Sequence, residues 1–347
     1  MTRPSFGYVV GGVGSSVAVE HGVLAEKFGF EKLWVPDHFV DVIDGDRLEP
    51  WTVLSAVAMV TKKIRLGSGV TDTQRNHPAR TAHMVASADV ISGGRVILGI
   101  GAGEAMNIVP FGLPWESAAD RVGRLAETIK VIRALSTSSR EKRIDFEGRY
   151  YRLKNAFLTQ SPKQKPHPPI YVGAFSSKQA LQVVGEFGDG WLPWLNTPTT
   201  FRRRWSIIQK TAESVGRSPS AIEPCVQLMV AFPNSSAEKR NALMAGKVNL
   251  IMEKSLLQEL GKMPEIDQYQ NLIAKPKNEA AKILNIAEKV PDDHVYRTMG
   301  IGSDDVREKV EDFTKVGVKH IAIVDLLSPK TIKRTLSLFR KIIRDHS

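Results

Sequence analysis

Short β-rich segments alternate with helix-length segments from one end of this chain to the other. This alternation is typical of parallel sheets whose strands are joined by crossover helices. Near the C-terminus, apolar side chains recur at spacings of 4, 3 and 4, which predicts a helix packed on the sheet through Ile332, Leu336, Phe339 and Ile343. The strand-like runs number eight: Phe6 to Val10, Lys32 to Val35, Ile64 to Gly69, Val96 to Ile100, Ile170 to Gly173, Gly190 to Pro193, Val226 to Phe232, and Lys319 to Val324.

Eight strand and helix pairs in 347 residues predict an α/β fold of the (β/α)8 TIM-barrel type. Length alone would also allow two domains. We expect a single TIM-barrel domain over residues 1–347, with insertions near 105–116, 143–157 and 235–297. Active sites in such barrels lie at the carboxyl ends of the strands, so candidate residues are sought directly after each run.

Composition and charge limit the class of function. The 42% hydrophobic and 24% charged residues are those of a folded globular protein. The net charge of +11 attracts polyanions, but the basic residues are spread out and no nucleic-acid-binding motif accompanies them, so no nucleic-acid partner is expected. No apolar stretch approaches the roughly 18 residues of a membrane span and no secretion signal opens the chain, which predicts a cytoplasmic protein without a membrane partner. A single cysteine, Cys225, and the lack of zinc-spaced Cys/His clusters predict neither a disulfide nor a metal site.

The second run is followed by an acid and an imidazole, Asp37 and His38. A histidine can give or take a proton near neutral pH, so the pair is a candidate for acid–base chemistry at a strand end. The same two residues also fit a helix-capping aspartate beside a structural histidine. The basic run of Arg202, Arg203 and Arg204 is predicted to be a solvated helix face, with contact to an acidic substrate as the alternative.

Glycines mark the ends of the third and fourth runs. Gly67 and Gly69 predict a bulge or a close approach of the backbone to a ligand. The fourth run ends Gly99-Ile100-Gly101-Ala102-Gly103-Glu104, which lacks the last glycine of a dinucleotide fingerprint. Alternate glycines would leave room for a planar ring over the barrel, with Glu104 at its edge, and bulge geometry explains them almost as well.

Small and hydroxylated residues follow the fifth run as Gly173-Ala174-Phe175-Ser176-Ser177. They open a predicted helix with Ser176 or Ser177 as its N-cap. Free backbone N–H groups at such a helix start can hold a phosphate, and later βα units of barrels often do so. Every capped helix shares part of this pattern.

The ordered motifs resemble the luciferase-like flavin and deazaflavin oxidoreductases of the bacterial luciferase superfamily. The resemblance covers most of the chain and rests on three stretches: Glu49-Pro50-Trp51 to Val70; His77-Pro78-Ala79 through Ser92-Gly93-Gly94-Arg95 to Gly103-Glu104; and Gly188-Asp189-Gly190-Trp191. Within the family, Gly103-Glu104-Ala105-Met106-Asn107 and Asp37-His38-Phe39 are similar to the branch that uses the deazaflavin coenzyme F420. Its members include methylenetetrahydromethanopterin reductases, glucose-6-phosphate dehydrogenases and secondary alcohol dehydrogenases.

This resemblance implies an F420-dependent oxidoreductase that transfers a hydride between the deazaflavin C5 and a small or pterin-bound substrate. It implies His38 and Glu104 as the catalytic residues, without saying which donates the proton. It also implies a non-prolyl cis peptide at Gly69-Val70 and a homodimer. The implied cofactor-binding residues are Asp37, Gly69, Val70, Thr71, Asn107, Gly173, Ala174, Phe175, Ser176 and Ser177.

Two departures bear on the substrate. Sugar-phosphate dehydrogenases of the family carry an aromatic residue soon after Asp-His-Phe and a lysine soon after the sixth strand. This chain has Val40-Asp41-Val42-Ile43 and Trp194-Leu195-Asn196 there, which argues against glucose 6-phosphate and leaves a methylenetetrahydromethanopterin reductase-like activity as the leading interpretation. Two alternatives stay open: an FMN-dependent monooxygenase, and a non-catalytic relative that binds a flavin or a polyanion.

Overall fold

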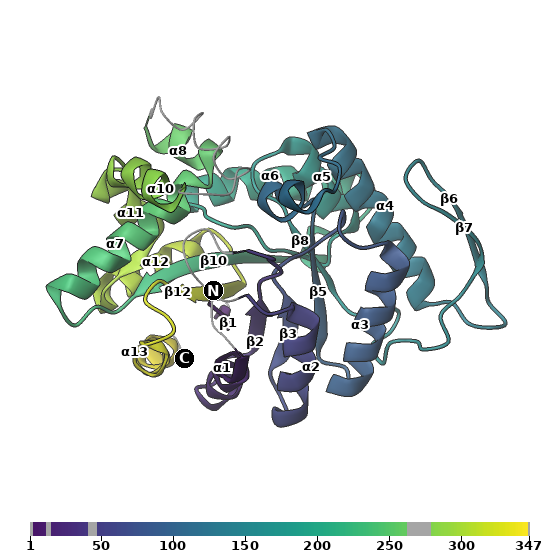
Figure 1. Ribbon diagram of the computed structural model, residues 1–347, viewed down its shortest axis with the longest axis horizontal. Coiled ribbons are helices and arrows are strands. Elements are labelled where there is room, and N and C mark those ends of the chain that lie inside the picture. Colours follow the sequence, from purple (N-terminus) through teal and green to yellow (C-terminus); the bar gives the residue numbers. More distant parts are fainter. Residues whose placement is uncertain (1–2, 12–14, 41–46, 262–278, 346–347) are drawn as a thin grey trace.

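Eight parallel strands close into a barrel with helices on its outside, as the sequence predicts (Figure 1). The computed structural model describes residues 3–11, 15–40, 47–261 and 279–345. The order around the barrel is β1, β2, β3, β5, β8, β9, β10 and β12, and β12 pairs with β1 to close it. Each of the eight predicted runs overlaps one barrel strand, with boundaries that differ by a few residues.

The strands are short, as is usual in such barrels. The barrel strands are β1 Ser5–Val9, β2 Lys32–Val35, β3 Arg65–Ser68, β5 Val96–Gly101, β8 Ile170–Gly173, β9 Gly190–Trp191, β10 Glu223–Ala231 and β12 His320–Asp325. Two short strands extend the sheet: β4 Thr71–Asp72 pairs with β5, and β11 Gly300–Ile301 pairs with β10. The carboxyl ends of the barrel strands form what we call the barrel mouth.

The helices follow the strands in βα order. They are α1 Ser15–Lys27, α2 Pro50–Val60, α3 Pro78–Ser92, α4 Ala118–Ser136, α5 Lys178–Phe187, α6 Pro198–Ser214, α7 Ser236–Ile251, α8 Lys254–Leu260, α10 Glu279–Glu288, α11 Asp292–Thr298, α12 Ser303–Lys315 and α13 Ile332–Asp345. Side-chain caps fix several helix starts, because Glu49, His77, Ser117 and Thr197 accept backbone N–H bonds of α2, α3, α4 and α6. No described helix is long and apolar enough to cross a membrane.

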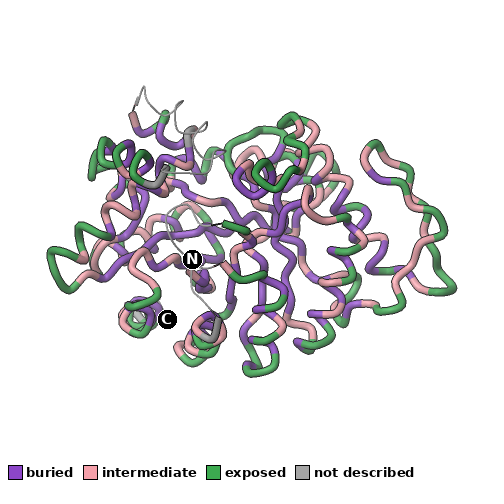
Figure 2. The backbone as a smooth tube through the Cα atoms, viewed as in Figure 1, coloured by how far each residue is buried: buried purple, intermediate pink, exposed green. Residues whose placement is uncertain are grey.

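The core has two layers, one inside the barrel and one between the barrel and its helices (Figure 2). In the outer layer, α13 buries the predicted stripe of Ile332, Leu336, Phe339 and Ile343, which confirms that expectation. The inner layer comprises Val9, Trp34, Ile97, Tyr171, Leu192, Cys225 and Ala322. A packed interior of this kind leaves the barrel mouth, and not a central channel, as the place for chemistry.

A polar cluster closes the amino-terminal floor of the barrel. Lys32 Nζ lies 2.6 Å from Glu223 Oε2, and the Tyr171 hydroxyl also donates to that oxygen. His320 is fully buried, with Nδ1 2.7 Å from Ser5 Oγ and Nε2 accepting from Trp34 Nε1 at 3.1 Å. Burial and the Lys32 charge hold the pKa of His320 well below its usual value, so the ring is neutral. These contacts lie at the end of the barrel that rarely carries catalysis.

The three segments expected as insertions have distinct structures. Residues 105–116 contain the 3-10 helices η1 Ala105–Asn107 and η2 Val109–Phe111, and residues 143–157 form an antiparallel hairpin of β6 Ile144–Glu147 and β7 Arg152–Ala156. Within residues 235–297, the described helices α7, α8, α10 and α11 build a separate apolar cluster. A third 3-10 helix, η3 Pro219–Ala221, precedes β10.

The basic run on α6 corrects one expectation. Arg202 and Arg203 are exposed, but Arg204 is buried, where it donates to Asn196 Oδ1 at 2.8 Å and to Ser255 Oγ at 3.2 Å. The prediction of a solvated face is therefore wrong for Arg204. Its side chain ties the loop after β9 to the start of α8.

Candidate active site

The barrel mouth brings His38, Glu104 and Asn107 together, as the sequence predicts from their places after β2 and β5. His38 Nδ1 lies 2.9 Å from Asn107 Nδ2 and 3.6 Å from Glu104 Oε2. The side chains of His38 and Glu104 are 23% and 41% exposed, so a ligand at the mouth can reach both. Asn107 is buried beneath them in η1.

Asn107 also accepts a hydrogen bond from the backbone of the residue that follows His38. Its Oδ1 accepts the Phe39 N–H at 2.8 Å. One buried side chain therefore bonds both the imidazole of His38 and the peptide that follows it. Glu104 Oε2 is buried as an atom and accepts no hydrogen bond within the described residues. A buried acceptor without a hydrogen-bond partner calls for a functional explanation, and the exposed part of the same carboxylate is open to a ligand.

Asp37 has a different environment from the one its sequence position suggests. Arg75 donates to Asp37 Oδ1 at 2.8 Å and to the Asp37 carbonyl oxygen at 2.9 Å, and its Nε donates to Asp72. Burial acts to lower the pKa of Arg75, but the two carboxylates outweigh it and raise that pKa above its usual value. Arg75 is therefore a permanent cation between two acids. The helix-capping interpretation of Asp37 is wrong, since Glu49 caps α2.

The glycines at the strand ends make room for Val70. The Gly69-Val70 peptide is cis, as the resemblance implies. A Cβ added at Gly101 or Gly173 would stand 2.8 or 2.9 Å from Val70 Cγ2, and one at Gly99 would collide with the Ser68 carbonyl oxygen. These glycines thus accommodate the bulge after β3, which favours the bulge explanation of Gly99 and Gly101 over space left directly for a ring. Val70 is half-buried, so a flat ligand could lie on it.

The start of α5 is open toward solvent. Ser177 is its N-cap and accepts from Ala180 N at 3.5 Å, while Phe175, Ser176 and Ser177 are exposed. Ala174 is buried, and its carbonyl oxygen accepts the Trp191 indole N–H at 2.9 Å. The hydrogen bond of Ala174 therefore anchors the loop, while Ser176 and Ser177 are exposed to solvent. This arrangement suits an anion at a helix N-terminus.

Thr71 is buried and accepts the Trp51 indole N–H at 3.1 Å.

Two aromatic rings lie beside the reactive cluster, and sequence reasoning did not single out their pairing. Phe39 and Phe111 are 51% and 47% exposed, with ring centroids 4.6 Å apart in an edge-to-face arrangement. The Arg75 guanidinium lies 4.4 Å from the Phe39 ring centroid. In the sequence, Phe39 and Phe111 stand out only as large apolar residues in the loops that follow β2 and β5. Exposed apolar surface of this kind marks binding sites.

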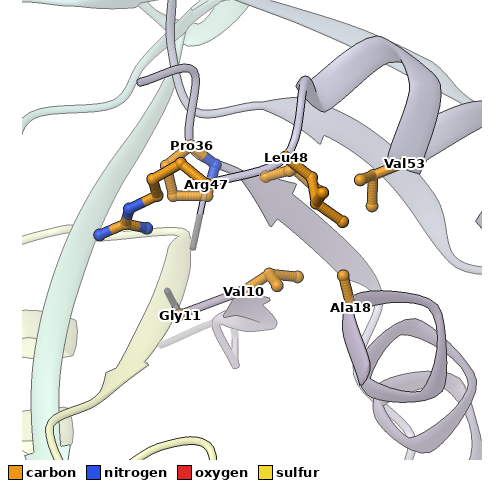
Figure 3. A pocket seen from close by; sticks show the side chains of 8 residues that line it. Val10, Gly11, Ala18, Pro36, Arg47, Leu48 and Val53 are labelled. Carbon is orange, nitrogen blue, oxygen red and sulfur yellow. The ribbon is translucent and has the colours of Figure 1, made fainter. Parts of the chain in front are cut away.

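A small pocket adjoins the mouth at the ends of β1 and β2 (Figure 3). Its wall is apolar, from Val10, Ala18, Leu48 and Val53, whereas the Arg47 side chain extends away from those groups.

Comparisons with known proteins agree with this architecture. The family model described as luciferase-like monooxygenase matches residues 7–320. A 5,10-methylenetetrahydromethanopterin reductase of Archaeoglobus fulgidus is 27% identical over 328 residues, which cover 92% of each chain. An F420-dependent glucose-6-phosphate dehydrogenase of Microbacterium testaceum is 28% identical over 336 residues, which cover 94% of this chain and 93% of that protein. The solved structure of an F420-dependent secondary alcohol dehydrogenase in complex with an F420-acetone adduct aligns at a TM-score of 0.83 and 23% identity, covering 100% of both chains.

Proposed function

The chain belongs to the luciferase-like monooxygenase family, and on that basis we propose that it is an F420-dependent oxidoreductase. It would transfer a hydride between the deazaflavin C5 and a carbon of a small or pterin-bound substrate. The observation that carries the proposal is the cluster of His38, Glu104 and Asn107 at the mouth, on the same side of the barrel as the open start of α5. Relatives along nearly the whole chain bear names of F420-dependent glucose-6-phosphate dehydrogenases.

The residues present fit such a cofactor. Val70 offers a half-buried apolar surface for a flat ring, and Glu104 Oε2, also in a loop at the mouth, is a polar atom without a hydrogen-bond partner among the described residues. The backbone from Gly173 to Ser177 would hold the phosphate of the cofactor tail, with Ser176 and Ser177 as hydroxyl donors. When bound, the deazaflavin supplies the hydride chemistry, and the protein supplies orientation and electrostatics.

His38 and Glu104 would act on the heteroatom bonded to the reacting carbon of the substrate, which is an oxygen in a ketone or alcohol and a nitrogen in a pterin-bound methylene group. A carbonyl oxygen that gains a hydride at its carbon develops negative charge and must receive a proton, and the reverse reaction must remove that proton. The two side chains border the same part of the mouth, since His38 Nδ1 and Glu104 Oε2 lie 3.6 Å apart. Asp37 and Thr71, expected as cofactor contacts, are engaged with Arg75 and Trp51, so we assign them to holding the mouth in shape.

For the substrate, a methylenetetrahydromethanopterin reductase-like activity remains our leading proposal. The exposed pair Phe39 and Phe111 suits a flat or apolar group beside the reaction centre. A sugar phosphate would need a cation there, and Arg75, which contacts Phe39, is already paired with two carboxylates.

We further propose that the enzyme is a cytoplasmic homodimer. The free thiol of Cys225 suits a reducing compartment. Met59 and Val60 at the end of α2, and Val90 and Ile91 at the end of the neighbouring α3, are exposed apolar residues that a second copy could cover. Sedimentation of wild type and of Ile91→Glu tests this, and a monomeric wild type would refute it.

The decisive experiment mixes the protein with oxidised and reduced F420 and with FMN, and records which chromophore binds. Retention of F420 followed by turnover with a pterin, ketone or alcohol substrate supports the proposal. Retention of FMN alone would favour the monooxygenase alternative. His38→Ala and Glu104→Gln are expected to lower turnover by about 10²-fold or more while leaving the chromophore bound. Near-normal turnover in both variants would remove them from the mechanism.

A further inference from the structure

The hydrogen bonds of Asn107 determine which end of its amide faces His38. The Phe39 backbone N–H is always a donor, and it points at Asn107 from 2.8 Å. Only the oxygen of the amide can accept that bond, so the NH2 group is the end that lies 2.9 Å from His38 Nδ1. The Phe39 N–H alone therefore fixes the orientation of the Asn107 amide group.

The same logic fixes the proton on the imidazole. An amide NH2 has only protons to offer, so His38 Nδ1 must accept from it at 2.9 Å and therefore carries no proton, while Glu104 Oε2, at 3.6 Å, lies beyond hydrogen-bond distance of that nitrogen. A neutral imidazole with a bare Nδ1 carries its proton on Nε2. We propose that Asn107 is a positioning residue that selects the Nε2–H tautomer of His38.

The packing around Asn107 prevents its amide from turning over and so maintains the Nε2–H tautomer of His38. Asn107 is 2% exposed, so water does not compete for its amide. Turning the amide over would set NH2 against the Phe39 N–H and oxygen against Nδ1, which loses both hydrogen bonds unless the imidazole is also re-protonated. The Phe39 peptide cannot easily move away, because Arg75 holds Asp37 and lies over the Phe39 ring.

One catalytic consequence rests on the function proposed above. Where the substrate is a ketone or alcohol, His38 would present an N–H from Nε2 to the substrate oxygen and stabilise negative charge there, as a neutral hydrogen-bond donor. It would not act as a base through Nδ1, because that atom is occupied by Asn107. The proton that the substrate oxygen gains or loses would then pass through Glu104, whose Oε2 accepts no hydrogen bond within the described chain.

Nuclear magnetic resonance of the cofactor-free protein tests the tautomer directly. In protein labelled with 15N-histidine, a bare ring nitrogen and a protonated one give well-separated shifts, and loss of signals in His38→Gln assigns those of His38. We expect a bare Nδ1 and a protonated Nε2. A proton on Nδ1 in the wild type would overturn the proposal. This spectrum is recorded on the wild-type protein, so it requires neither a folded variant at position 107 nor enzymatic activity.

Asn107→Asp then tests whether Asn107 is the cause. Aspartate keeps an oxygen for the Phe39 N–H and replaces the donor that faces His38 by an acceptor, so the proton is expected on Nδ1. An unchanged tautomer in this variant would show that Asn107 does not select it.

Kinetics separate positioning from a merely structural role. We expect kcat of Asn107→Asp to fall by about 10²-fold, because a wrong histidine tautomer disables catalysis, with KM for the cofactor within about threefold of wild type. Asn285→Asp, the same exchange at an exposed site of α10, should leave kcat unchanged. Equal kcat in Asn107→Asp and wild type would overturn the catalytic consequence. If F420 is not turned over at all, the proposed function fails while the spectra still decide the tautomer.

Discussion

Arg75 donates two hydrogen bonds to Asp37 across 38 positions of sequence, one to the carboxylate at 2.8 Å and one to the carbonyl oxygen at 2.9 Å. Asp37 directly precedes His38, and Phe39, which directly follows it, lies under the Arg75 guanidinium. One buried cation from the loop between β4 and α3 therefore fixes the histidine-bearing loop after β2. The position of the proposed catalytic residue His38 therefore depends on Arg75, which lies outside the proposed reaction centre.

Replacing Arg75 should impair catalysis and stability together. Arg75→Met leaves Asp37 and Asp72 buried without their cation, which costs about 3 kcal/mol or more in the free energy of unfolding. We expect kcat to fall at least about tenfold because His38 loses its support. Urea denaturation and steady-state kinetics measure the two effects. Arg80→Met, at an exposed site of α3, is the control, and equal behaviour of the two variants would contradict this role.

Phe111 should matter for substrate affinity more than for chemistry. Phe111→Ala removes one of two exposed rings beside His38, so KM for a flat or apolar substrate is expected to rise about tenfold, equivalent to roughly 1.4 kcal/mol, with kcat little changed. Val215→Ala removes a similarly exposed apolar side chain at the end of α6 and should change neither constant. An unchanged KM in Phe111→Ala would show that the aromatic pair does not meet the substrate.

Glu26 should stabilise the fold in a pH-dependent way. Its Oε2 accepts backbone N–H bonds from Lys62, Lys63 and Ile64 at 3.0, 2.7 and 2.8 Å. Partial burial acts to raise the pKa of Glu26, but these donors outweigh it and lower that pKa. A lowered folded-state pKa contributes stability above the unfolded value of about 4.3, and the contribution disappears as the pH falls through the folded value.

Glu26→Gln is therefore expected to lose about 1–2 kcal/mol of unfolding free energy at pH 7 and progressively less below about pH 4. Denaturant melts of both proteins across this range measure the difference. Glu186→Gln, at an exposed position of α5, serves as the control. A difference that stays constant down to pH 3 would mean that the carboxylate charge is not what stabilises this loop.

Breaking the ion pair between Lys32 and Glu223 in the barrel floor should lower the free energy of unfolding strongly. Glu223→Gln leaves Lys32 buried without its carboxylate, and we expect a loss of about 3 kcal/mol in the free energy of unfolding. Adding Lys32→Met should restore part of that loss, because no buried charge then remains. Glu147→Gln breaks the exposed pair with Arg152 and should cost below about 1 kcal/mol. Similar losses in the two single variants would argue that the floor pair is solvated.

The barrel could be predicted from the sequence because alternating strand and helix patterns are local signals. The nearness of His38 and Glu104 also followed, since strand ends of a parallel barrel meet at one mouth. The partners of Asp37 could not be predicted, because an arginine in a loop looks the same whether it is solvated or buried. Arg204 was misjudged for the same reason. The sequence could not decide between a ring and a bulge as the reason for Gly99 and Gly101, because their neighbours Ser68 and Val70 come from another strand end.

The isolation of Cys225 inside the barrel has a practical use. Burial raises the pKa of this thiol well above its ordinary value, so it stays protonated and out of reach of alkylating reagents. A fluorophore carried on a maleimide would therefore react with a newly introduced surface cysteine and leave the native one untouched. The natural sequence is thus already a labelling background, and ligand entry at the mouth can be followed by fluorescence without first removing a residue from the core.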